Sequence, residues 1–480
     1  MKKGDVTEFE IIKYAFEGKG IAKVKKSLIV PSKEESAEEN YVVFVQGSYP
    51  GDKVKAKLSR IKNSFAEAST VEIIHTSDLR TIAECEYFGT CGGCKQQDLQ
   101  YSNQVRFKQQ QVEEIFTKMG GFKNLTIEDI IAADETYFYR NKMEFSFADE
   151  RWLTYDEIKT GEEIDRNFAL GLHIPKMFDK VLDIKRCYLQ SEVSNRILNF
   201  TRSFFKSRNT SIYSSQTNMG YLRNLVVRQS KHTDDLMINI VTFYEDDALM
   251  KEYSDEILKA VPEITTIVNN INTKKALVAL GDYEKVIYGT GFIHDYIGKY
   301  KFRISANSFF QTNTLQAEKL YNTALEFADF NGDEIVYDLY SGAGTISIFI
   351  SEKVKNVYAI EAVESAVIDA GENVKLNNIH NVSFISADLY KSFLNIVNDN
   401  LPKPDVIILD PPRSGMHTNT VEDILNLEPQ KIVYVSCNPA TQVRDIKLLT
   451  TEKYKLIKLK PVDMFPQTYH IENVALLERV

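Results

Sequence analysis

Seven apolar, β-branched runs recur through the last 175 residues of the chain, and helix-length segments separate them. The runs cover 334–339, 356–360, 382–385, 405–409, 431–435, 454–459 and 473–478. Strand-like runs that alternate with helices predict a doubly wound α/β sheet. In such a sheet, ligands bind at the carboxyl ends of the strands. The pattern therefore limits where a functional site can lie.

Three polar stretches lie beside the ends of these runs. They read DPPRSG from Asp410, YVSCN from Tyr434 and DMFPQTYHIE from Asp463. Because the carboxyl ends of parallel strands meet at one edge, we expect Asp410, Cys437 and Glu472 to converge there. The sequence thus predicts a site with two carboxylates and one thiol.

At 480 residues the chain is too long for one hydrophobic core. Short strand-like runs with turns between them suggest a small β-barrel of the oligonucleotide-binding type near the N-terminus. We expect four segments: a β-barrel at 1–75, a cysteine loop and helix at 76–125, a central α/β domain at 126–305, and the doubly wound, Rossmann-like domain at 306–480.

Composition is that of an ordinary globular chain, with 43% hydrophobic and 26% charged residues. No window reaches the roughly 20 apolar residues of a membrane span, and the first residues lack the apolar core of a signal peptide. We therefore expect a cytoplasmic monomer that does not contact membranes. The net charge of -9 argues weakly against a nucleic-acid partner, although one basic face can still bind RNA.

Basic residues at 52–60 fall mostly on one face of a predicted strand. They indicate either a lysine-protected edge strand or a face that follows a phosphate backbone. Arg140, Arg223 and Arg228 of the central domain could line an RNA surface, but solvated strand faces explain them equally well. The acidic run at 32–40 is expected to be a loop.

Cys85, Cys91 and Cys94 form a C-x5-C-x2-C cluster, and Cys187 lies far downstream. Three thiolates separated by glycines can surround one metal centre, and a fourth completes the coordination. Sulfur ligands suit an iron–sulfur cluster or zinc, and the spacing does not decide between them. The alternative is that these cysteines are buried without a ligand.

A glycine turn, DLYSGAGT from Asp338, follows the first strand of the last domain. Glycines there let a ligand approach the N-terminus of the next helix. Glu361 ends the second strand, where a carboxylate can bind a ribose diol, and Asp388 follows the third, near an adenine edge. A dinucleotide is the rival ligand, but the third glycine of its fingerprint is missing. S-adenosylmethionine fits better.

The motifs DPPRSG, YVSCN and DMFPQTYHIE, with FFQTN from Phe309, resemble the RNA uracil-5-methyltransferase family. Residues 6–75 are similar to the TRAM RNA-binding barrel. The four cysteines resemble the 4Fe-4S site of the branch that modifies 23S rRNA. The resemblance implies an S-adenosylmethionine-dependent enzyme that makes 5-methyluridine, with 23S rRNA as the expected partner and tRNA as the alternative.

The resemblance also implies the roles of particular residues. Cys437 is the expected nucleophile and Glu472 the expected general base. Gln311, Tyr340, Glu361 and Asp410 are expected to contact the cofactor, with Asp388 as a weaker fifth, and Cys85, Cys91, Cys94 and Cys187 to bind the 4Fe-4S cluster.

Chemistry supports these roles independently. Carbon 5 of uracil is a weak nucleophile, and a thiolate that adds to carbon 6 makes it reactive. A base must then remove the carbon 5 proton. A cytosine-5-methyltransferase would use the same addition, but the RNA type commonly has a second cysteine near the site. An amino-methylating enzyme needs no thiol, and a non-enzymatic iron–sulfur RNA-binding protein leaves Cys437 and Glu472 unused.

Overall fold

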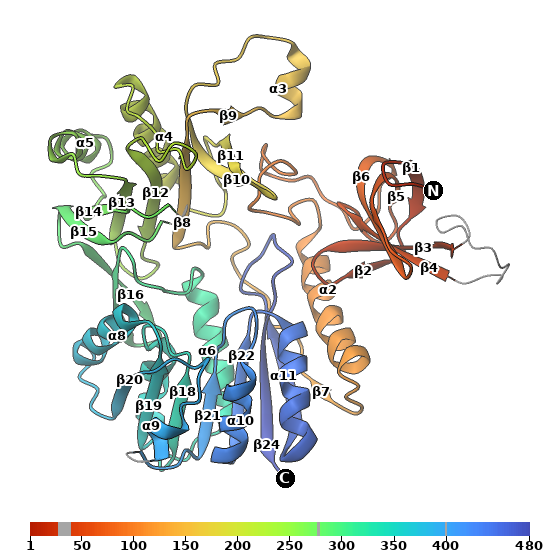
Figure 1. Ribbon diagram of the computed structural model, residues 1–480, viewed down its shortest axis with the longest axis vertical. Coiled ribbons are helices and arrows are strands. Elements are labelled where there is room, and N and C mark those ends of the chain that lie inside the picture. The colour runs from red at the N-terminus through yellow and green to blue at the C-terminus, as the bar shows by residue number, and fades with distance from the viewer. Residues whose placement is uncertain (27–39, 276–278, 399–400) are drawn as a thin grey trace. The chain divides into compact units, whose positions relative to one another are not determined.

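The computed structural model describes residues 1–26, 40–275, 279–398 and 401–480 (Figure 1). Most of the acidic run at 32–40 lies outside these residues. The chain divides into two compact units. The small unit comprises Met1–Phe88, Cys94–Glu114 and Phe465–His470, and the large unit comprises Gly89–Gly93, Ile115–Met464 and Ile471–Val480.

Six strands form the sheet of the small unit, in the order β1-β5-β6-β4-β3-β2. They are β1 (Val6–Glu10), β2 (Lys13–Ala15), β3 (Lys19–Lys25), β4 (Asn40–Gln46), β5 (Lys53–Ile61) and β6 (Phe65–His75). The sheet curls around one apolar core that includes Phe9, Tyr41 and Val54 (Figure 1). This arrangement confirms the predicted N-terminal barrel.

The basic residues of β5 do not lie on an edge strand, because β5 pairs with both β1 and β6. The edge-strand interpretation was therefore wrong. Lys53 forms an ion pair with Glu8 at 3.0 Å, and Lys55 pairs with Glu72 at 2.9 Å. Part of this positive face is thus neutralised by carboxylates on the neighbouring strands.

Among the described residues, the helix α2 (Tyr101–Glu114) also belongs to the small unit, and a π-helical turn, η1 (Ile115–Met119), follows it in the large unit. The sequence predicts a helix over 102–119 with an apolar stripe; Val112, Ile115 and Phe116 of this stripe are buried, whereas Met119 is 61% exposed. The helix α2 also buries polar side chains one and two turns apart: Gln104, Lys108 and Gln111. Such buried polar side chains are typical of a helix face that forms hydrogen bonds with the backbone of neighbouring segments.

An eight-stranded sheet forms the central part of the large unit, in the order β15-β14-β13-β12-β8-β10-β11-β9. Its strands are β8 (Lys142–Ala148), β9 (Arg151–Trp152), β10 (Ala169–Ile174), β11 (Met177–Asp183), β12 (Leu222–Gln229), β13 (Leu236–Thr242), β14 (Thr266–Ile271) and β15 (Tyr283–Tyr288). The helices of this part are α3 (Tyr155–Thr160), α4 (Glu192–Ser207) and α5 (Asp247–Ala260). The hairpin β16 (Phe292–Ile297) and β17 (Tyr300–Ser305) follows.

A second eight-stranded sheet has the order β20-β19-β18-β21-β22-β24-β23-β7. Its strands are β7 (Thr126–Ile127), β18 (Ile335–Leu339), β19 (Asn356–Glu361), β20 (Val382–Ser386), β21 (Val406–Leu409), β22 (Lys431–Ser436), β23 (Tyr454–Val462) and β24 (Glu472–Arg479). The intervening helices are α6 (Thr314–Ala328), α7 (Thr345–Ile350), η2 (Ser351–Lys353), α8 (Glu364–Leu376), α9 (Leu394–Asn398), α10 (Thr418–Leu427) and α11 (Pro439–Glu452). All seven runs predicted from the sequence are strands, which confirms the doubly wound fold.

The arginines of β12 are buried rather than solvated. Arg223 is 4% exposed and donates to the carbonyls of Asn272 and Lys274 at 2.8 and 2.7 Å. Arg228 is 2% exposed and donates to the Ala306 carbonyl at 3.2 Å, and burial lowers its pKa to about 10. Neither arginine lies on a surface that RNA could contact, so both interpretations of these two residues were wrong.

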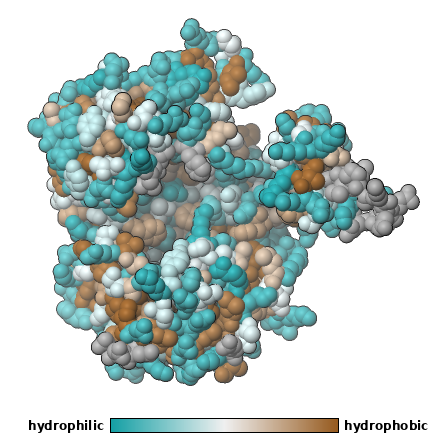
Figure 2. All heavy atoms as spheres, viewed as in Figure 1, coloured by the Kyte–Doolittle hydropathy of each residue, from teal (hydrophilic) through white to brown (hydrophobic). Residues whose placement is uncertain are grey.

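The surface drawn in Figure 2 is mostly hydrophilic, with hydrophobic residues in scattered groups. Scattered apolar residues are normal on a protein surface. Within the described ranges, no helix is long and apolar enough to cross a membrane.

Candidate active site

Cys437 and Glu472 lie at the same end of two antiparallel neighbours, β22 and β24. Ser436 is opposite Asn473 in this pair, so the residue after Ser436 and the residue before Asn473 are neighbours across the ladder. Gln442 of α11 is fully buried and fixes this end. Its amide donates to the Asn473 carbonyl at 3.2 Å and its oxygen accepts from Asn473 Nδ2 at 2.7 Å.

The DPPRSG loop that follows β21 is fastened to the start of α11. Asn438 Nδ2 and Thr441 Oγ1 both donate to the Arg413 carbonyl at 3.2 Å. A Cβ at Gly415, whose φ is +79°, would lie 2.5 Å from Oδ2 of Asp445, so only glycine fits at this close approach. The loop and the YVSCN motif are thereby held against each other.

The Cys437 thiol lies in a cluster of charged groups. Burial, followed by the charges of Glu472 and Asp410, raises the pKa of this thiol to about 12. Arg413 acts in the opposite direction, by its positive charge and by a side-chain hydrogen bond to the sulfur. Arg413 therefore favours the thiolate, which is the nucleophilic form.

The two carboxyls of this cluster also bind protons tightly. Glu472 is 6% exposed, and burial, followed by the charge of Asp410, raises its pKa well above the ordinary value. Burial, followed by the charge of Asp338, raises the pKa of Asp410 to about 7. A carboxylate with a raised pKa is a better proton acceptor once it is ionised.

The glycine turn after β18 and the end of β19 are brought together. Glu361 Oε2 accepts a hydrogen bond from the Gly342 N–H at 2.9 Å. Tyr340 has a φ of +64°, a conformation that is uncommon outside glycine and that clusters at functional sites. Asp388 is exposed and accepts from the Tyr390 N–H at 3.0 Å.

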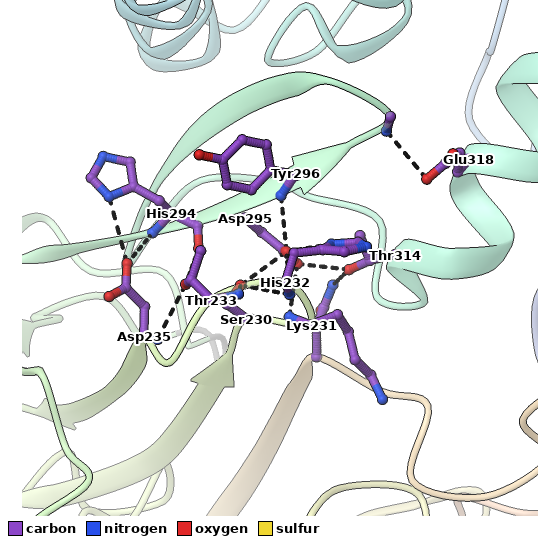
Figure 3. Close-up of polar contacts among 12 residues, drawn as sticks. Ser230, Lys231, His232, Thr233, Asp235, His294, Asp295, Tyr296, Thr314 and Glu318 are labelled. Carbon is purple, nitrogen blue, oxygen red and sulfur yellow. Dashed lines mark hydrogen bonds and ion pairs between the residues drawn. The ribbon is translucent and has the colours of Figure 1, made fainter.

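A polar network around Asp295 includes Ser230, His232 and Thr314 (Figure 3), and it extends to the backbone of Gln311. Asn141 Nδ2 donates to the Gln311 carbonyl at 2.7 Å and to Thr314 Oγ1 at 2.8 Å. Thr314 in turn donates to Oδ2 of Asp295 at 2.9 Å. Asp295 is 1% exposed and also accepts from Ser230 Oγ at 2.9 Å. The first turn of α6 is therefore tied to the loop after β12.

Two aromatic residues were not predicted as candidates: Tyr321, which interacts with the charged cluster, and Phe309, which is exposed at the surface. Tyr321 of α6 is buried, and its pKa is raised by burial and by the charges of Asp410, Asp338 and Glu472, which places it beneath the same cluster. Phe309 is 66% exposed beside Gln311, whereas Phe310 is buried. Phe309 is part of the FFQTN motif, but the sequence does not show which of the two phenylalanines is exposed.

The four clustered cysteines are divided between the units: Cys85 and Cys94 belong to the small unit, and Cys91 and Cys187 to the large unit. All four are among the described residues, and within these no group of three or more His, Cys, Asp or Glu side chains could hold a metal ion. The structure does not support the predicted metal site.

Comparison with known proteins agrees with the geometry of the site. The model of the family tRNA (Uracil-5-)-methyltransferase matches residues 240–480, and the TRAM domain model matches residues 2–71. A protein of Chlorobaculum tepidum named an uncharacterized RNA methyltransferase is 41% identical over 100% of this chain and 97% of its own length. A protein of Bacteroides thetaiotaomicron with the same description is 42% identical over 97% of this chain and 99% of its own.

A solved structure gives the same result. The Pyrococcus abyssi tRNA (uracil-54, C5)-methyltransferase, in complex with S-adenosyl-L-homocysteine, has a TM-score of 0.73 and 26% sequence identity, and the match covers 98% of this chain and 100% of that one. The resemblance found in the sequence motifs is confirmed. The chain belongs to the RNA uracil-5-methyltransferase family.

Proposed function

We propose that this protein transfers a methyl group from S-adenosylmethionine to carbon 5 of a uridine in RNA, through a covalent adduct of Cys437. One observation supports this most strongly. The thiol of Cys437 and the carboxyl of Glu472 lie at one end of two paired strands, and Asp410 and Arg413 act on both groups.

The first step forms a bond between Cys437 Sγ and carbon 6 of the uracil. Arg413 stabilises the thiolate that attacks, and the electron pair of the carbon 5–carbon 6 double bond moves onto carbon 5 and its carbonyl. Bound S-adenosylmethionine supplies an electrophilic methyl group to carbon 5 and leaves as S-adenosylhomocysteine. Asp410 is placed to bind the uracil edge or the methionine part of the cofactor.

The second step restores the ring. Glu472, as a carboxylate, takes the proton from carbon 5, the electron pair re-forms the double bond, and the thiolate of Cys437 leaves carbon 6. The raised pKa of Glu472 makes it a strong enough base for a carbon-bound proton. The methylated uridine is then free to dissociate.

For the cofactor we propose a site at the carboxyl ends of β18, β19 and β21. Gln311, Tyr340, Glu361 and Asp410 would hold it, with Asp388 at the outer end. The hydrogen bond from the Gly342 N–H orients the Glu361 carboxylate, and this supports a role for Glu361 in binding a ribose diol. The methyltransferase of Pyrococcus abyssi contains S-adenosyl-L-homocysteine, which supports this assignment.

For the RNA we propose 23S rRNA, bound by the barrel of segment 1–75 and by the central domain of segment 126–305. A tRNA is the second candidate, because the Pyrococcus abyssi neighbour is a tRNA methyltransferase. A cytosine-5-methyltransferase would use the same thiol addition, but its RNA type commonly has a second cysteine near the site. A non-enzymatic RNA-binding protein would explain the TRAM barrel and leave Cys437 and Glu472 unused. We expect a monomer, which size-exclusion chromatography with light scattering would test.

The test is incubation with S-adenosylmethionine and RNA that contains 5-fluorouridine, followed by a denaturing gel. Glu472 cannot remove fluorine as a proton, so the adduct accumulates. We expect a shifted band with wild type, and no band with Cys437→Ala, which should still bind the cofactor. No band with wild-type protein on either 23S rRNA or tRNA substrates, while the cofactor binds, would contradict the proposal.

The 4Fe-4S cluster remains a prediction from the resemblance, and no step above depends on it. Purification without oxygen, followed by iron and sulfide analysis, would test it. About four iron atoms per chain would support the cluster. Zinc, or no metal, would leave the cysteines as part of the loop alone.

A further inference from the structure

The chain passes through the small unit immediately before it reaches Glu472. Met464 belongs to the large unit, Phe465–His470 to the small unit, and Ile471 to the large unit again. We call Phe465–His470 the 465–470 loop. It forms the middle of the DMFPQTYHIE motif, so the path of the backbone into Glu472 depends on what holds this loop.

Gln104 of α2 binds Gln467, at the centre of the 465–470 loop, through both the oxygen and the nitrogen of its side-chain amide. Its Oε1 accepts from the Gln467 N–H at 2.9 Å, and its Nε2 donates to Gln467 Oε1 at 3.0 Å. The same Nε2 donates to the carbonyls of Gln96 and Leu99 at 2.9 Å. Gln104 has 0% exposure, so water cannot replace these bonds.

Further contacts in the small unit fasten the same loop. The N–H groups of Lys95 and Gln96 donate to the Gln467 carbonyl at 2.8 and 3.0 Å. Lys108, one turn after Gln104, has 0% exposure, and its Nζ donates to the Phe465 carbonyl at 3.2 Å. Burial of an ammonium group is costly unless hydrogen bonds compensate it, so this contact helps to offset the cost of burying Lys108.

The backbone of the loop is strained where Gln104 binds it. Gln467 has a φ of +66°, which costs a residue other than glycine about 1 kcal/mol or more. Such a conformation persists only where the surroundings enforce it. Loss of the Gln104 bonds would let Gln467 relax to a negative φ, and the chain five residues later would change direction.

We propose that Gln104, assisted by Lys108, is a positioning residue for Glu472. By fixing Gln467 it sets the path of the chain into β24 and keeps the Glu472 carboxyl opposite the Cys437 thiol. The inference rests on the proposed role of Glu472 in removing the carbon 5 proton. It assigns the α2 helix a part in the release step of the reaction.

The chain offers a matched control on the same helix. Gln111 lies two turns after Gln104 and is 4% exposed, and within the described residues its side-chain amide has no hydrogen-bond partner. Gln104→Ala and Gln111→Ala therefore remove the same atoms from the same buried face. Only the first removes a contact with the 465–470 loop.

The experiment follows adduct formation and release separately, on RNA with ordinary uridine and with 5-fluorouridine. With ordinary uridine, we expect Gln104→Ala to accumulate a covalent adduct and to lose tenfold or more in kcat, since a small displacement of a catalytic group can cost about 100-fold. Trapping on 5-fluorouridine, which needs no proton removal, and cofactor affinity should stay within twofold of wild type. Gln111→Ala should match wild type in every assay.

Thermal midpoints of all variants show whether they fold. If Gln104→Ala does not fold, Lys108→Met tests the same loop through Phe465 and should also accumulate adduct. The inference is overturned if Glu472→Gln accumulates adduct but neither loop variant does, or if the loop variants slow trapping as much as release. If Glu472→Gln itself releases product normally, the proposed role of Glu472 fails instead.

Discussion

Asp338, at the end of β18, is a buried carboxyl whose ionisation opposes folding. It is 0% exposed, its Oδ2 accepts from Ser347 Oγ at 2.5 Å, and its Oδ1 has no hydrogen-bond partner among the described residues. Burial is the main cause that raises its pKa from 3.8 to about 7, and the Glu361 charge adds to it. We therefore expect Asp338→Asn to stabilise the protein at high pH.

The raised pKa of Asp338 determines how the stability of the protein changes with pH. A carboxyl with a raised folded-state pKa stabilises the protein when protonated, and that stabilisation is lost as the pH rises from about 4 through about 7. A shift of about three units corresponds to roughly 4 kcal/mol above both pKa values. About 2.5 kcal/mol of it is lost between pH 5 and pH 8. An asparagine does not ionise and avoids this loss.

Differential scanning calorimetry of the full chain at pH 5 and pH 8 measures the effect. Relative to wild type, Asp338→Asn should gain roughly 2 to 4 °C more in Tm at pH 8 than at pH 5. Ser347→Ala removes the hydrogen bond that favours the carboxylate, so it should lower the Tm more at pH 8 than at pH 5. Parallel pH curves for wild type and Asp338→Asn would refute the reasoning.

Three further predictions concern the cofactor, the RNA and the thiol. Asp295→Asn should weaken S-adenosylhomocysteine binding about tenfold in titration calorimetry, because it breaks one buried hydrogen bond to Thr314 worth about 1 to 2 kcal/mol. The control is Asp235→Asn, which affects a contact with His294 and should leave this binding unchanged. We propose that the ring of Phe309, which is 66% exposed, stacks on an RNA base. Phe309→Ala should then weaken RNA binding about tenfold in fluorescence polarisation, and unchanged affinity would contradict this stacking. Because the pKa of Cys437 is raised to about 12, single-turnover trapping on 5-fluorouridine should accelerate from pH 6 to pH 9, and a flat profile would argue against a protonated resting thiol.

The sequence predicts the doubly wound sheet well because each of its strands carries its own signal. An apolar run that ends in a glycine turn or a polar motif marks both the strand and the edge where the site lies. The barrel is harder to predict. The run at 8–14 reads as one strand, but the chain changes partner at its middle, since β1 pairs with β5 and β2 pairs with β3. Local periodicity does not encode a change of partner.

The contacts that hold the site depend on residues far apart in the sequence. Gln104 and Gln467 are separated by 363 residues, and nothing near either one marks the other. In the sequence, α2 reads as an apolar helix, and the polar residues of its inner face look like solvated positions. Likewise Arg223 and Arg228 look like strand-face cations, because the carbonyls they bind come from distant loops. Local sequence patterns do not predict hydrogen bonds between polar residues that are far apart in the chain.

The ionisable groups of the site influence one another, so their relative positions matter. Cys437, Glu472 and Asp410 each become negative on ionisation. Glu472 and Asp410 raise the pKa of Cys437, Asp410 also raises that of Glu472, and Arg413 opposes both effects. Groups coupled in this way do not titrate independently, so a pH–rate profile reports the cluster rather than one residue. Ionising two members at once is costly, and the cost depends on their separation, because the repulsion grows as the charges approach. A loop that fixes the backbone before Glu472 therefore controls the proton affinity of Cys437 as well as the position of the base.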